Sequence, residues 1–79
     1  MNWRQHIDRD PAVLGGKPKL RGTRLCVDLI LGRLGEGWAA DQLRQAYPHI
    51  TDEQIQACMA FAADALATDE VIDVPLSAA

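Results

Sequence analysis

Two sequence breaks divide residues 27–67 into three helical segments, and this division constrains the fold more than any other feature. The first segment carries apolar residues at i, i+3, i+4 and i+7, namely Val27, Ile30, Leu31 and Leu34. This spacing places them on one face of a helix. Gly35-Glu36-Gly37 then predicts the end of that helix, because glycine accepts the left-handed conformation of a helix cap.

The second break is Pro48, which cannot continue a helix. Residues 39–47 before it predict a short second helix. Thr51 and Gln54 after it have the spacing of a capping box, which predicts a third helix that extends to about Ala67. The inner face of this third helix is predicted to contain Ile55, Cys58, Met59, Ala62 and Leu66.

Residues 18–27 alternate between basic and apolar side chains and predict a short β element. Lys19, Arg21 and Arg24 are expected to point outward, and Leu20 and Leu25 inward. Gly22-Thr23 fits the centre of a type II′ hairpin loop, which takes glycine first. That register would place Arg21 opposite Arg24, and like charges directly opposite are destabilising. An extended, unpaired strand avoids this clash and is the alternative.

The chain of 79 residues is long enough for one domain at most. We expect an N-terminal arm with little regular structure over residues 1–14 and a single domain over residues 15–67. Residues 68–79 are expected to form an acidic and apolar C-terminal tail. A core of this size is marginal, which favours stabilisation by pairing with another chain.

The charges are split along the chain. Residues 1–33 carry seven basic and three acidic groups, whereas residues 34–79 carry one basic and eight acidic groups. The formal net charge is −3 at pH 7. The basic half suits an anionic partner, which the acidic half would repel.

The sequence offers no arrangement for catalysis, a metal or a cofactor. His6 and His49 are far apart in the sequence, and neither cysteine has a nearby histidine. The glycines of residues 15–24 lack the spacing of a phosphate-binding loop. Cys26 and Cys58 are expected to be free thiols. Because no catalytic arrangement is present, we expect a protein that is not an enzyme. No apolar stretch approaches a membrane span and no leader is evident, so we expect it in the cytoplasm.

Several motifs appear together and in order. They are Asp10-Pro11, Gly15-Gly16-Lys17-Pro18, Gly22-Thr23-Arg24, Val27, Gly37, Tyr47-Pro48, Thr51 and the alanine-rich third helix. Over residues 7–67 the chain resembles the bacterial domain-of-unknown-function 433 family, whose members include VapB-type antitoxins. The resemblance implies a mainly α fold with a homeodomain-like three-helix core, similar to a helix-turn-helix, preceded by a short β element. Family members often start the second helix with Ser or Thr, whereas this chain has Ala39.

The resemblance also implies an antitoxin of a type II toxin–antitoxin system, which neutralises a PIN-like ribonuclease toxin. The cluster of basic residues favours operator DNA as a further partner. The third helix starts with Asp52-Glu53-Gln54 and has no Lys or Arg, so it is poorly suited to the major groove. The candidate residues for nucleic-acid or toxin binding are instead Lys17, Lys19, Arg21, Thr23, Arg24 and Arg33. Arginines suit DNA phosphates, and they also suit the metal-binding carboxylates of such a ribonuclease. The C-terminal tail is a second candidate for toxin contact.

The third helix is covered with alanine and has few outward charges, which favours burial on two sides. We therefore expect a homodimer, whose candidate interface contains Ala57, Ala60, Phe61, Ala63 and Asp64. Two alternatives to an antitoxin stay open. One is a stand-alone DNA-binding transcriptional regulator, and the other is a dimeric protein-interaction module.

Overall fold

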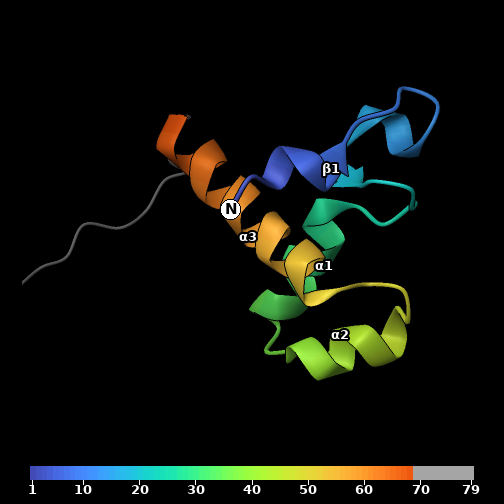
Figure 1. Cartoon of the computed structure of the whole chain (residues 1–79), viewed down its shortest axis with the longest axis vertical. Coiled ribbons are helices and arrows are strands. Elements are labelled where there is room, and N and C mark those ends of the chain that lie inside the picture. The colour runs from blue at the N-terminus through green and yellow to red at the C-terminus, as the bar shows by residue number, and fades with distance from the viewer. Residues whose placement is uncertain (69–79) are drawn as a thin grey trace, which may run out of the picture.

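The computed structural model describes residues 1–68, and within them it contains three α-helices and a two-stranded antiparallel sheet (Figure 1). The helices are α1 (Val27–Gly35), α2 (Ala40–Ala46) and α3 (Asp52–Thr68). The strands are β1 (Ile7–Asp8) and β2 (Lys19–Leu20), and two short 3-10 helices are η1 (Trp3–Gln5) and η2 (Leu14–Gly16). This confirms the mainly α fold with a three-helix core and a short N-terminal β element. The predicted tail lies outside the described residues from position 69 onward.

The end of α1 has the geometry that its glycines predict. Gly37 has φ +98°, in the left-handed region that favours glycine. Its amide donates to the carbonyl of Leu34 (3.0 Å), and the amide of Trp38 donates to the carbonyl of Arg33 (3.0 Å). This pair of hydrogen bonds is a Schellman motif, which satisfies the last carbonyls of the helix.

The starts of α2 and α3 differ in one hydroxyl group. At α3, the Gln54 amide donates to Thr51 Oγ1 (3.1 Å) and the Thr51 amide donates to Gln54 Oε1 (2.9 Å), so the predicted capping box is complete. At α2, the Ala39 amide donates to Gln42 Oε1 (2.7 Å), but the Ala39 side chain has no oxygen to return the bond. The capping box of α2 is therefore half formed.

We expect Ala39→Ser to raise the free energy of unfolding by about 0.5–1 kcal/mol, because serine supplies the missing cap acceptor. The matched change Thr51→Ala should lower it by about 1 kcal/mol. Urea unfolding of both variants measures these effects. Equal effects of one sign in the two variants would contradict this account of the caps.

The sheet differs from the sequence prediction, because one of its strands comes from the N-terminal arm. β1 pairs with β2 in the register Ile7↔Leu20 and Asp8↔Lys19, and the Arg21 amide extends the pairing by donating to the His6 carbonyl (2.8 Å). The predicted arm with little regular structure over residues 1–14 therefore includes a two-residue strand that the sequence did not predict. The arm has no long apolar run that would predict a strand. Two residues are enough to form β1 because they pair with β2.

The turn after β2 is also different from the predicted type II′ loop. The Thr23 amide donates to the Leu20 carbonyl (3.1 Å), so Gly22 is the third residue of the turn, with φ +73°. A positive φ at this position is typical of a type II turn. The Thr23 hydroxyl donates to the same Leu20 carbonyl (2.8 Å) and accepts from the Leu25 amide (3.0 Å). Thr23 therefore stabilises the turn with both of its hydrogen-bonding functions.

The core joins the sheet to all three helices. Leu20, Ile30, Leu43 and Cys58 are fully buried and come from β2, α1, α2 and α3 in turn. Both cysteines are free thiols, as predicted. Met59 and Leu66 correct the predicted inner face of α3, since they are 47% and 61% exposed. Ala57 takes a core position instead and is fully buried.

The N-terminal arm covers part of α3 and changes the predicted dimer interface. The Trp3 ring meets the Phe61 ring edge-on, with centroids 4.9 Å apart, and Trp3 Nε1 donates to Asp64 Oδ2 (2.6 Å). Phe61 and Asp64 therefore already have contacts within the chain, and the buried Ala57 cannot touch a partner. The outer surface of α3 that stays exposed instead contains Met59, Ala63 and Leu66.

Candidate anion-binding surface

Lys19 was expected to face outward, but the structure places it in the interior. Its side chain is only 8% exposed, and its ammonium lies 2.7 Å from Asp8 Oδ1. Lys19 sits between two chain segments, because it pairs with Asp8 in β1 and bridges to Cys26 on the other side. Lys19 and Leu20 are both buried, so both faces of β2 are covered and the alternation of residues 18–27 does not predict the exposure of Lys19. Lys19 is a structural cation and is not accessible to a partner.

The other cations of residues 17–24 are exposed, but they differ in their contacts. Lys17 pairs with Asp28 at 3.3 Å, and both side chains are well exposed. Arg21 reaches Asp8 Oδ2 (3.5 Å) and donates to the Arg4 carbonyl (3.0 Å), while its side chain stays 54% exposed. Arg24 is exposed and has no carboxylate partner among residues 1–68. Arg24 is therefore the member of this segment with the most available charge.

Arg33 lies apart from this group, at the far end of α1. Its guanidinium stacks over the Trp38 ring, 5.0 Å from the centroid, and pairs with Glu36 at 3.4 Å. The side chain of Tyr47 and then the Glu36 carboxylate raise the pKa of Arg33 above its ordinary value. These contacts link α1 to the start and end of α2, so the structure gives Arg33 a packing role at this corner.

Two arginines of the arm join the exposed cations, and the sequence analysis missed both as site residues. The Arg4 guanidinium stacks over Trp3, 4.3 Å from the ring centroid. Arg9 follows Asp8, the β1 residue that pairs with Lys19. Its Nε donates a hydrogen bond to the Gly16 carbonyl (2.8 Å). Within the described part of the chain, neither Arg4 nor Arg9 has a carboxylate partner. In the sequence, only the overall positive charge of residues 1–33 indicated that Arg4 and Arg9 belong to a basic surface.

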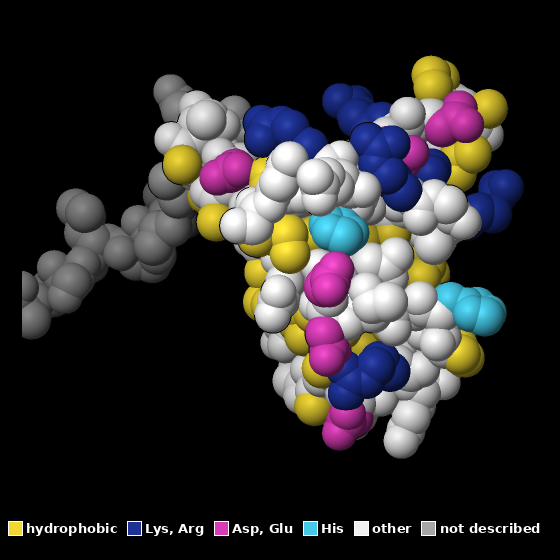
Figure 2. Space-filling model, in the orientation of Figure 1, with side chains coloured by type: hydrophobic (Ala, Val, Ile, Leu, Met, Phe, Trp, Pro, Cys, Tyr) yellow, Lys and Arg dark blue, Asp and Glu magenta, His cyan; other side chains and the backbone are white. Residues whose placement is uncertain are grey.

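We define the arginine surface as Arg4, Arg9, Arg21 and Arg24. All four are exposed, and the β1–β2 pairing brings Arg21 to Arg4, whose carbonyl accepts a hydrogen bond from the Arg21 guanidinium. Figure 2 shows Lys and Arg side chains gathered over the strands and their neighbouring loops, in the upper part of the view. At the opposite end, Arg44 is bound by Asp41 and Asp52, which leaves little positive charge there. The charge split of the sequence is therefore also a split in space.

The chemistry available at this surface is anion binding. Guanidinium groups bind phosphate or carboxylate oxygens through paired N–H donors and stay charged at all physiological pH values. Burial raises the pKa of the Cys58 thiol to about 11, and burial followed by the charge of Asp28 raises that of Cys26, so neither is activated as a nucleophile. Residues 1–68 contain no cluster of three or more His, Cys, Asp or Glu side chains that could hold a metal ion. None of the helices described is both long and apolar enough to span a bilayer.

Known proteins resemble the chain over most of its length. A crystal structure of a DUF433 member protein from Anabaena variabilis ATCC 29413 matches it with a TM-score of 0.71 and 27% sequence identity. The match covers 80% of this chain and 66% of that chain, so this chain spans slightly less than two thirds of that relative. No curated protein matches the chain. The family model described as "Protein of unknown function (DUF433)" matches residues 7–62, and the chain therefore belongs to the DUF433 family.

Proposed function

We propose that this protein is the antitoxin of a type II toxin–antitoxin system. In this proposal it acts in the cytoplasm, neutralises a PIN-like ribonuclease toxin and contacts operator DNA through the arginine surface. The observation that carries the proposal is the set of exposed arginines, of which Arg4, Arg9 and Arg24 have no carboxylate partner in residues 1–68. A folded domain that leaves these charges without a carboxylate partner, while it pairs Lys19 and Arg44 with its own carboxylates, is suited to an anionic partner.

The mode of DNA contact in this proposal differs from that of an ordinary helix-turn-helix. α3 begins with the exposed carboxylates of Asp52 and Glu53, which phosphates would repel. The arginine surface lies instead on η1 and on the loops that flank β1 and β2. Proteins that read DNA with β ribbons are known, and phosphate contacts by arginine fix their position on the duplex. The role of the arginines is therefore to grip the DNA backbone.

The antitoxin role is tested by expressing the neighbouring small reading frame, alone and together with this protein. We expect growth to stop when the neighbouring frame is expressed alone and to recover when both are present. A neighbouring frame that is harmless, or a toxic one that this chain does not silence, would contradict the antitoxin proposal. In the first case the arginine surface would serve a stand-alone DNA-binding regulator.

We further propose a homodimer through the exposed side of α3. Met59, Ala63 and Leu66 are exposed at i, i+4 and i+7, which puts two large apolar side chains and one small one on one helical face. Met59→Lys combined with Leu66→Lys is expected to convert the dimer to a monomer in sedimentation velocity experiments, whereas Gln45→Lys on α2 should leave it a dimer. A wild-type protein that sediments as a monomer at all concentrations would exclude this interface.

A further inference from the structure

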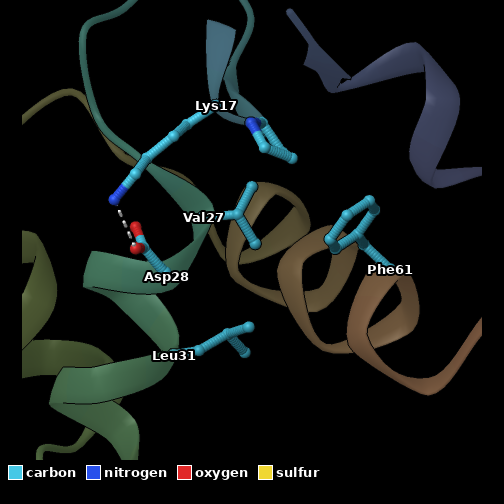
Figure 3. A pocket seen from close by; sticks show the side chains of 6 residues that line it. Lys17, Val27, Asp28, Leu31 and Phe61 are labelled. Carbon is cyan, nitrogen blue, oxygen red and sulfur yellow. Dashed lines mark hydrogen bonds and ion pairs between the residues drawn. The ribbon is translucent and has the colours of Figure 1, made fainter. Parts of the chain in front are cut away.

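Two hollows lined mainly by apolar side chains lie beside Phe61. The first has a volume of about 290 Å³ and is lined by Val27 and Leu31 of α1, together with Pro18 and Phe61. The second has a volume of about 260 Å³, and Pro18 and Phe61 line it as well. Since both hollows are lined by Pro18 and Phe61, they are neighbours, and we call the two together the apolar trough. Figure 3 shows Val27, Leu31 and Phe61 converging on the first hollow from α1 and α3.

The rim of this trough is charged. Lys17 and Asp28 face each other across one edge of the first hollow, where the dashed line in Figure 3 marks their ion pair. Arg9 lines the second hollow together with Asp8, and the Asp8 carboxylate forms an ion pair with the buried Lys19. Exposed ion pairs such as Lys17–Asp28 exchange partners at little cost. The rim therefore offers the positive charge of Lys17 to an acidic segment.

The chain itself carries a segment of matching chemistry directly after α3. Residues 69–76 read Asp-Glu-Val-Ile-Asp-Val-Pro-Leu, so they combine four apolar side chains with three carboxylates. α3 ends at Thr68, seven residues beyond Phe61, which corresponds to about 10 Å along a helix. Eight residues can span up to about 26 Å. The segment is therefore long enough to reach back past Phe61 to both hollows.

We propose that residues 69–76 bind the apolar trough of their own chain. In this arrangement Val71, Ile72, Val74 and Leu76 supply side chains for the two hollows, and the carboxylates of the segment meet Lys17. The driving force is the removal of the apolar walls of the trough and of the segment from water.

The test is NMR spectroscopy of the full chain with labelled methyl groups and aromatic rings. We expect nuclear Overhauser effects from the methyl groups of Ile72 and Val74 to those of Val27 and Leu31 and to the Phe61 ring. The double change Ile72→Asp and Val74→Asp should abolish these effects and shift the Val27 and Leu31 methyl resonances. The control Ser77→Asp adds charge one residue beyond the segment and should shift neither.

A mixed sample of differently labelled chains separates the possible occupants. Effects that persist within one chain and are absent between chains support the proposal. Effects seen only between chains would assign the trough to a second copy and overturn it. The complete absence of effects from residues 69–76 to the trough, with Val27 and Leu31 unmoved by the double change, would overturn it too.

Discussion

Asp8→Asn is expected to lower the free energy of unfolding by about 3 kcal/mol, because it leaves the Lys19 ammonium buried without a counter-charge. The Lys19 side chain is 8% exposed and lies 2.7 Å from Asp8 Oδ1, whereas Asp8 itself is 31% exposed. Removing one partner of a buried pair costs about 3–5 kcal/mol, and the partial exposure of Asp8 favours the lower end. For a domain of this size the melting temperature should fall by more than about 10 °C. Thermal and urea unfolding followed by circular dichroism measure both quantities.

Two controls show whether the buried charge is the cause. Lys19→Met removes the buried charge itself and leaves Asp8 with Arg21, 3.5 Å away, so we expect a loss of about 1 kcal/mol or less. Asp28→Asn breaks the exposed pair with Lys17, and a surface pair is worth about 0–1 kcal/mol. If Asp8→Asn proved no more costly than these two changes, the Lys19–Asp8 pair would not be a structural requirement of the sheet.

The same ion pair shows where the sequence was informative and where it was not. The ends of the helices are local features, so Gly37 and the Thr51–Gln54 pair could be predicted from neighbouring residues and are confirmed. The position of Lys19 depends instead on β1, which is eleven residues away in the sequence. Alternation predicts which side chains share a face of a strand, but it does not predict whether other segments of the chain cover both faces.

The candidate site was predictable only in part, for a related reason. The positive half of the chain and the exposure of Arg21 and Arg24 follow from the sequence. Arg4 and Arg9 join them because the arm pairs with β2, a non-local contact that two-residue strands do not reveal in advance. On α3, the alanine pattern could not separate the side that packs inward at Ala57 from the side that faces outward at Ala63.

The strongest functional effect is expected from Arg9→Gln combined with Arg24→Gln. Each phosphate contact contributes about 0.9 to the slope of log K against log salt concentration. Loss of two contacts should therefore flatten this slope by about 1.8 and weaken binding at 0.1 M salt by about 60-fold. Neither arginine pairs with a carboxylate in the part of the chain that the structure describes, so the change should leave thermal stability nearly intact. Fluorescence anisotropy with a duplex from upstream of the protein's own gene, over a range of salt concentrations, measures the slope.

Arg44→Gln supplies the matched control for this experiment. Arg44 carries the same charge, but Asp41 and Asp52 bind it at the end of the molecule away from the sheet. Its replacement should leave the salt slope unchanged, even if the protein becomes less stable. A slope that stays the same in the Arg9 and Arg24 variant, or that falls equally in the Arg44 variant, would remove DNA from the partners of the arginine surface. Loss of toxin neutralisation by the same double variant, with DNA binding intact, would then assign the surface to the toxin's carboxylates, because both partners offer guanidinium groups the same paired oxygen acceptors.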